Sequence, residues 1–153
     1  MVIKVTCTFF GHRDAPMALS PFIETFLQEL ISKNGVTRFL VGNQGQFDAM
    51  VTRALVQLKE TFPQISFAVV LAYLPQTQAP SSLVAPQETI FPTGLELVPP
   101  AFAIQKRNLW MLGQADCVVT YVTDCFGNAE KFRRRAVNQG KRVWNLAELW
   151  QKD

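Results

Sequence analysis

The chain has 153 residues, of which 48% are hydrophobic and 18% are charged, with 15 Lys and Arg residues against 12 Asp and Glu residues. These values exclude a disordered chain and predict a single domain over residues 1–153 with a buried core. With 1 His and 3 scattered Cys residues, the chain lacks the ligands for multi-histidine or Cys-x-x-Cys metal sites, so we expect no metal.

The first half of the chain alternates between strand and helix patterns. Runs of β-branched, aromatic or continuous apolar residues predict strands, and apolar residues at helical spacing predict helices. The Ser20-Pro21 pair suits a helix start, with the Ser20 hydroxyl as the cap, and Asn34-Gly35 suits a helix end. The expected order is strand 2–10, helix 20–34, strand 36–41, helix 47–58 and strand 65–71.

The second half begins with a proline-rich excursion over 75–100, which is much longer than an ordinary loop of about 4–6 residues. We expect this excursion to be a packed crossover, to hide a small hairpin, or to form a lid. The elements expected after it are helix 101–112, strand 116–122, helix 129–138, strand 141–145 and a helical turn over 146–150.

This alternation of strands and helices predicts an α/β fold. Strands that alternate with helices form a parallel sheet, and right-handed crossovers place the helices on both of its faces. We therefore expect a Rossmann-like three-layer fold with a parallel sheet of about five strands.

Three loops that follow expected strands are rich in glycine and polar residues. They are Gly11-His12-Arg13-Asp14, the segment over 42–48 and the segment over 123–129. In an open parallel sheet, such loops meet at one edge, where ligands bind and where helix N-termini favour anions. Arg13 could hold a phosphate through two hydrogen bonds, and His12 could donate a hydrogen bond or titrate near neutrality.

The same loops exclude two common nucleotide motifs. The first loop lacks the Gly-x-Gly-x-x-Gly spacing of dinucleotide-binding proteins, and no Gly-Lys-Ser/Thr follows any strand. We therefore predict neither a bound cofactor nor Walker-type ATP hydrolysis.

Several motifs, taken together, resemble a known superfamily. The segment Cys7-Thr8-Phe9-Phe10-Gly11-His12-Arg13 is similar to the Cys-x-x-x-Gly-His-Arg opening of bacterial and phage SLOG-superfamily proteins. This Rossmann-like group also contains the DNA-processing Smf proteins and the LOG ("lonely guy") phosphoribohydrolases. Further similarity lies in Gly42-Asn43-Gln44-Gly45-Gln46-Phe47-Asp48, in 89–111 and in 115–129, so it covers nearly the whole chain.

The resemblance implies a cytosolic domain that binds a nucleotide or a nucleotide-derived small molecule, as a sensor or binding module. A turn that is often aromatic-Gly-Gly-Ala in this group is Phe126-Gly127-Asn128-Ala129 here. The ligand-binding residues that we expect are Gly11, His12, Arg13, Gly42, Asn43, Gln44, Gly45, Asp48, Arg107, Asn108, Gly127 and Asn128.

Two other functions remain open. One is hydrolysis of a nucleoside phosphate at its N-glycosidic bond, with Glu130 as a weak catalytic candidate or Asp48 in that role. However, the Pro-Gly-Gly-x-Gly-Thr-x-x-Glu run of the LOG enzymes is absent from this chain. The other is association with DNA, which the Smf branch and the basic residues over 131–135 suggest, but nucleic acid is the less favoured partner.

Location and assembly follow from composition alone. The odd Cys count, the absence of a signal peptide and apolar runs too short for a bilayer favour a cytoplasmic protein without a membrane partner. The apolar content permits a homodimer without requiring one.

Overall fold

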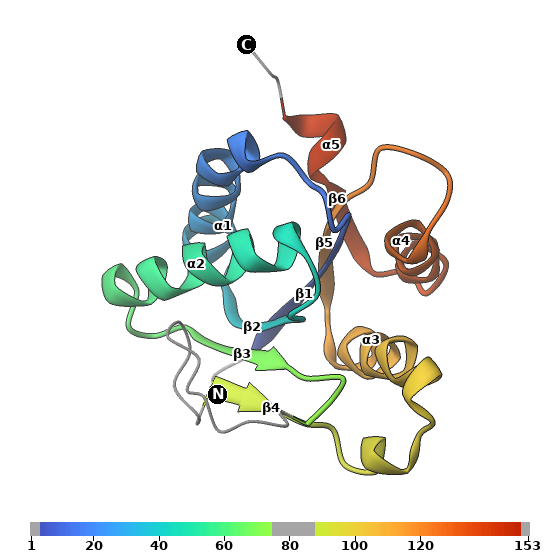
Figure 1. Cartoon of the computed structure of the whole chain (residues 1–153). Coiled ribbons are helices and arrows are strands. Elements are labelled where there is room, and N and C mark those ends of the chain that lie inside the picture. The colour runs from blue at the N-terminus through green and yellow to red at the C-terminus, as the bar shows by residue number, and fades with distance from the viewer. Residues whose placement is uncertain (1–3, 75–87, 151–153) are drawn as a thin grey trace.

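The computed structural model describes residues 4–74 and 88–150 and contains a six-stranded parallel sheet (Figure 1). The strands are β1 (Val5–Gly11), β2 (Val36–Val41), β3 (Ser66–Val70), β4 (Thr89–Ile90), β5 (Cys117–Tyr121) and β6 (Arg142–Asn145). Their order across the sheet is β4-β3-β2-β1-β5-β6, and every neighbouring pair is parallel. The predicted Rossmann-like α/β fold is confirmed, with one strand more than the five expected.

The helices cover both faces of the sheet (Figure 1). They are α1 (Ser20–Asn34), α2 (Gln46–Thr61), α3 (Ala103–Gln114), α4 (Asn128–Asn138) and α5 (Leu146–Leu149). Helices α1 and α2 pack together on one face, and α3 and α4 lie on the other.

The ends of α1 show one prediction that holds and one that is wrong. Gly35 ends the helix in the left-handed conformation, with φ of 69°, as the Asn-Gly pair predicted. Ser20, however, does not cap the start, because a 3-10 turn over Met17–Leu19 runs directly into the helix. Ser20 is therefore already helical, and Leu19 holds the cap position without a side-chain hydrogen bond.

The described part of the proline-rich excursion contains the extra strand. Strand β4 pairs in parallel with β3, and the Leu71 N–H donates to the Ile90 carbonyl at 2.8 Å. Two short 3-10 turns, over Leu95–Leu97 and Pro100–Phe102, then lead into α3. The described part of this segment thus contains a parallel edge strand, whereas a hairpin was one of the alternatives considered. Residues 75–87 lie outside the described residues, so the alternative of a lid stays a prediction.

Two apolar cores lie on opposite faces of the sheet. Because side chains alternate along a strand, Phe9 packs against α1 and α2 while its neighbour Phe10 packs against α3 and α4. The Phe9 ring stacks on Phe39, and the Phe10 ring stacks on Phe132 at a centroid distance of 5.1 Å. Strand β1 is therefore buried on both sides.

The strand order also fixes where a ligand can bind. From β1 the chain proceeds to β2 on one side, whereas β5 lies on the other side of β1. In open α/β sheets the crevice forms at such a reversal of direction, beyond the carboxyl ends of the strands. The loops after β1 and β5 flank this point.

A glycine at the end of β1 is required by the packing of α2. A Cβ atom on Gly11 would overlap the ring of Phe47, which is fully buried. We expect Gly11→Ala to lower the free energy of unfolding by about 1–3 kcal/mol, measured by urea denaturation, because the ring has no room to move.

Gly113 provides the matched control. It lies in α3, and a Cβ atom there would meet no heavy atom within 4 Å. Gly113→Ala should therefore raise the free energy of unfolding by about 0.5–1 kcal/mol. Equal stability of the Gly11→Ala protein and the original protein would contradict this account of the turn.

Candidate functional site

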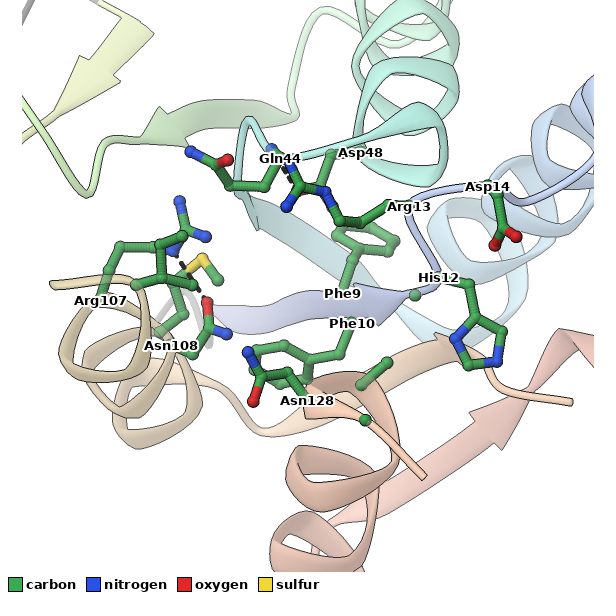
Figure 2. A pocket seen from close by; sticks show the side chains of 15 residues that line it. Phe9, Phe10, His12, Arg13, Asp14, Gln44, Asp48, Arg107, Asn108 and Asn128 are labelled. Carbon is green, nitrogen blue, oxygen red and sulfur yellow. Dashed lines mark hydrogen bonds between the residues drawn. The ribbon is translucent and has the colours of Figure 1, made fainter. Parts of the chain in front are cut away.

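The loops after β1, β2 and β5 line one cavity of about 370 Å³ at the carboxyl edge of the sheet (Figure 2). This volume lies in the range of small-molecule sites. Of the residues predicted from the sequence, the structure brings Gly11, His12, Arg13, Gln44, Asp48, Arg107, Asn108, Gly127 and Asn128 together in the wall. The remaining three, Gly42, Asn43 and Gly45, do not line the cavity but contact residues that do.

The first and second loops are joined through their backbones. The Gln46 N–H donates to the Arg13 carbonyl at 2.8 Å. Gly45 has φ of 100°, a conformation that L side chains rarely adopt, and a Cβ atom there would lie 2.6 Å from the Arg13 Cα. Gly45 is therefore required both by its conformation and by the close approach, which holds the exposed Arg13 side chain at the cavity mouth.

His12 joins the first loop to the third. Its backbone N–H donates to the Tyr121 carbonyl, and its Nε2 accepts a hydrogen bond from the Thr123 N–H at 2.9 Å. An accepting Nε2 requires a neutral ring with its proton on Nδ1. His12 thus holds two loops together, and only its Nδ1–H can donate to a ligand.

Asp48 is a buried carboxylate in the first turn of α2. Only 8% of the residue is exposed, and its Oδ2 accepts the Gln44 N–H at 2.9 Å. Burial raises the pKa of Asp48 to about 6, although the Gln44 N–H and the charges of Arg107 and Arg13 act to lower it. The group therefore titrates close to neutral pH.

Arg107 and Asp48 both lie against Gly42. A Cβ atom on Gly42 would lie 2.9 Å from Asp48 Oδ2 and 3.0 Å from Arg107 Cζ, so the absence of a side chain leaves room for both. Arg107 is only 2% exposed, and its Nη1 donates to the Val70 carbonyl at 2.9 Å. Burial lowers the pKa of Arg107, while the charge of Asp48 acts to raise it.

Further hydrogen bonds from Arg107 connect α3 to the second loop. Its Nε donates to Asn108 Oδ1 at 2.8 Å, and its Nη1 also reaches Asn43 Oδ1 at 3.4 Å. The guanidinium therefore links α3, β3 and the β2–α2 loop. Asn43 therefore contacts the site through Arg107 and does not itself line the cavity.

Three buried polar groups still have free hydrogen-bonding atoms. Asp48 Oδ1, Arg107 Nη2 and Asn108 Nδ2 make no hydrogen bond to the described residues. Within residues 4–74 and 88–150, the Thr37 hydroxyl is the one side-chain polar atom that is inaccessible to solvent and has no hydrogen-bond partner. The three free atoms are therefore accessible to solvent, and since their residues line the cavity, we infer that they open into it.

The start of α4 forms another part of the wall. Gly127 holds the N-cap position with φ of 99° and ψ of 173°, nearly the same conformation as Gly45 at the start of α2. A Cβ atom on Gly127 would meet nothing within 4 Å, so its backbone faces open space. Free N–H groups of this first turn favour an anion in the cavity.

Glu130 lies outside the cavity wall. Arg133 holds its carboxylate through two hydrogen bonds of 2.7 and 2.6 Å, and Arg134 adds a third of 3.0 Å. These partners, Arg133 first, keep the pKa of Glu130 below its usual value. The arrangement stabilises the first turn of α4 and does not favour Glu130 as a general base.

Other lining residues were not predicted as ligand-binding from the sequence: Phe9, Phe10, Asp14, Ile104, Met111 and Ala129. Ile104 and Met111 could have been found, because they share one helix face with Arg107 and Asn108 at i, i+3, i+4 and i+7 spacing.

Within the described ranges, no helix is long and apolar enough to cross a membrane, and no group of three His, Cys, Asp or Glu side chains could hold a metal.

Comparison with known proteins identifies the fold of this chain but does not assign it to a family. No protein-family model and no curated protein match the chain. DNA processing protein A from Streptococcus pneumoniae is similar in structure, with a TM-score of 0.67 and 16% identity over 92% of this chain and 49% of that one. DNA processing protein A from Helicobacter pylori, described for its single-stranded DNA binding mode, has a TM-score of 0.57 and 16% identity over 91% of this chain and 63% of that one. The chain thus shares a Rossmann-like fold with about half to somewhat under two thirds of these proteins.

The raised pKa of Asp48 predicts how stability depends on pH. Because the folded-state pKa of about 6 exceeds the usual 3.8, the folded protein binds more protons than the unfolded chain between these values. The contribution of Asp48 to the free energy of unfolding should therefore fall by about 1–3 kcal/mol as pH rises from 4 to 7, and it is obtained by comparing the original protein with Asp48→Asn at each pH. Asp48→Asn should remove this contribution and be more stable than the original protein at pH 7.5, as measured by urea denaturation. A less stable Asp48→Asn protein at that pH would contradict the prediction.

Proposed function

We propose that the crevice binds a nucleotide or a nucleotide-derived small molecule, and that the protein acts as a binding or sensor module. The observation that carries this proposal is the set of free atoms on Asp48, Arg107 and Asn108, which are buried and open into one cavity. Burying polar groups without partners is costly, so their free atoms suit a ligand that supplies the missing hydrogen bonds. Membership of the SLOG superfamily, in its Gly-His-Arg branch, would agree with this role.

The polar end of the cavity suits a phosphate. The start of α4 at Gly127 and Asn128 presents backbone N–H groups, and the exposed guanidinium of Arg13 lies at the mouth. In Figure 2, Arg13 and Asn128 approach the cavity from opposite sides. A phosphate between them would receive both backbone and guanidinium hydrogen bonds.

The remaining wall suits a nucleobase. Phe10, Ile104 and Met111 contribute apolar surface, and the free Asn108 Nδ2 beside them could donate to a ring nitrogen or a carbonyl of a base. An apolar slot with one or two polar groups is typical of sites that select planar heterocycles. This end of the cavity lies on α3, away from His12 (Figure 2).

A thermal-shift screen tests the proposal. Mono-, di- and cyclic nucleotides, nicotinamide and ADP-ribose derivatives are each added at millimolar concentration. A ligand present at 100 times its Kd adds about 2.7 kcal/mol to the free energy of unfolding, which corresponds to a Tm increase of roughly 5–10 °C. Arg13→Ala should abolish the shift, whereas Arg53→Ala, in α2 and outside the cavity, should preserve it. No shift with any ligand would contradict the proposal.

Single-stranded DNA is a second candidate. The structural similarity to DNA processing protein A supports it, since the Helicobacter pylori protein is described for binding single-stranded DNA. Phe126, which is 76% exposed, directly precedes the cavity residue Gly127 and could stack on a base. Lys131 and Arg135 are exposed on α4, whereas Arg133 and Arg134 are held by Glu130.

Fluorescence anisotropy with a labelled 20-nucleotide oligothymidylate tests this candidate. We expect binding that weakens steeply with salt, and the Lys131→Gln, Arg135→Gln double variant should reduce the salt slope by roughly 1–2. Phe126→Ala should weaken binding by about 1–3 kcal/mol through loss of stacking. Leu149→Ala, an exposed apolar residue of α5, serves as the control. Absence of binding at low salt would rule the candidate out.

For N-glycosidic hydrolysis, Glu130 does not suit the acid/base role, because it faces two arginines and lies outside the cavity wall, whereas Asp48, the other residue expected for that role, lines the cavity. Hydrolysis stays a prediction that ranks behind ligand binding. We infer a cytoplasmic location, which is supported by the three cysteines being free thiols.

A further inference from the structure

We propose that the crevice selects ribonucleotides over 2′-deoxyribonucleotides, with Asp48 Oδ1 accepting a hydrogen bond from a ribose hydroxyl. This inference rests on the proposed nucleotide-binding function and names the part of the ligand that Asp48 recognises. It also assigns the specificity of the site to one residue, so it can fail while nucleotide binding itself stands.

The surroundings of Asp48 require a neutral donor. Its Oδ2 is engaged by the Gln44 N–H, and its Oδ1 opens into the cavity without a partner among the described residues. The positive charges of Arg107 and Arg13 already act on this carboxylate. A ligand ammonium group or a metal ion would be repelled by these two guanidinium groups. A hydroxyl or an uncharged amino group therefore fits Oδ1.

The neighbouring donors favour a hydroxyl over an amino group. Arg107 lies against the same Gly42 Cα as Asp48 and has a free Nη2, and Asn108 beside it has a free Nδ2. These groups donate only, so the ligand must accept from them and donate to Asp48 on the same wall. An amino group conjugated to a base ring only donates, whereas a hydroxyl does both. The vicinal 2′- and 3′-hydroxyls of ribose provide two such groups side by side.

The position of Asp48 in the fold agrees with this assignment. Asp48 follows β2, next to β1 and its switch point, and lies in the first turn of α2. In doubly wound folds a phosphate lies at the switch point, and an acidic residue further along the same edge binds the ribose hydroxyls. A phosphate near Asn128 and Arg13 would place the sugar of the nucleotide between them and α3 (Figure 2).

The expected selectivity follows from the loss of one hydrogen bond to a buried charged group. A 2′-deoxyribonucleotide lacks one hydroxyl donor, so the poorly solvated carboxylate of Asp48 loses a hydrogen bond. We expect this loss to weaken binding by roughly 10- to 100-fold. The contact would also distinguish a free ribonucleotide from a strand of DNA.

The test is isothermal titration calorimetry on the full chain at pH 7.5 with AMP, GMP, CMP and UMP and with their four 2′-deoxy counterparts. We expect at least one ribonucleotide to bind 10-fold or more tightly than its deoxy counterpart. Asp48→Asn should reduce this ratio to less than about 3-fold, and its urea denaturation curve reports that it is folded. Glu24→Gln, an exposed carboxylate of α1 outside the cavity, should keep the original ratio.

The number of protons released on binding provides a second readout. If Asp48 had only a structural role, this number would not differ between the two ligands. A hydroxyl donated to Oδ1 favours the ionised carboxylate, so at pH 6 the ribonucleotide should release more protons on binding than its deoxy counterpart. This difference is measured in two buffers of different ionisation enthalpy and should vanish in Asp48→Asn. Comparing the two ligands removes the contributions that both share, which include those of their phosphates and of the other charged or ionisable groups in the wall, His12, Asp14, Arg13 and Arg107.

The outcomes separate the two proposals. Equal affinities for both sugars, or an unchanged ratio in Asp48→Asn, would overturn the ribose assignment and leave nucleotide binding intact. Binding of none of the eight nucleotides, together with no hit in the thermal-shift screen, would overturn nucleotide binding itself.

Discussion

The burial of two opposite charges around Gly42 is the constraint on which the candidate site depends. Asp48 and Arg107 are 8% and 2% exposed, and each approaches the Cα of Gly42 closely enough that a side chain there would displace one of them. Burial disfavours the ionised form of each group, and each acts to stabilise the charge of the other; for Asp48 the effect of burial is the larger, so its pKa stays raised. The hydrogen bond of Arg107 to the Val70 carbonyl joins α3 to β3, and the hydrogen bond to Asn108 within α3 orients the guanidinium.

The same edge of the sheet is organised by backbone contacts between loops that are distant in sequence. The first loop is bound to the second through Arg13 and Gln46, and to the third through His12 and Thr123. Because β1 lies at the centre of the sheet, its loop can reach both neighbours at once. Glycines with positive φ hold the N-cap positions of α2 and α4; at α2 the Gln46 N–H binds the Arg13 carbonyl, and at α4 the first residues line the cavity. The site is thus built mainly from rigid elements and joined loops, as a pre-organised binding site requires.

Much of the architecture was predictable from local pattern. The order of strands and helices, the glycine end of α1 and the gathering of three polar loops follow from side-chain periodicity and from the geometry of parallel sheets. Strand β4 was not predicted, because two residues of an edge strand carry no periodicity of their own. Ser20 did not cap α1, since the 3-10 turn before it depends on how the preceding chain packs. A catalytic role of Glu130 stays a prediction, but the sequence did not reveal that arginines three and four residues further along the helix bind its carboxylate.

The sequence by itself determined the fold class, the edge of the sheet at which the cavity lies and most of the residues in the cavity wall. Each of these depends on local pattern or on general rules of strand order. Only the tertiary structure decided that Arg107 is buried and anchored, that the pKa of Asp48 is raised to about 6, and that His12 accepts a hydrogen bond instead of donating one through Nε2. Those properties arise from groups that lie far apart in the chain, such as Arg107 and Val70 or His12 and Thr123. Burial and hydrogen-bond partners are set by which segments meet in space, and spacing along the chain carries no record of them.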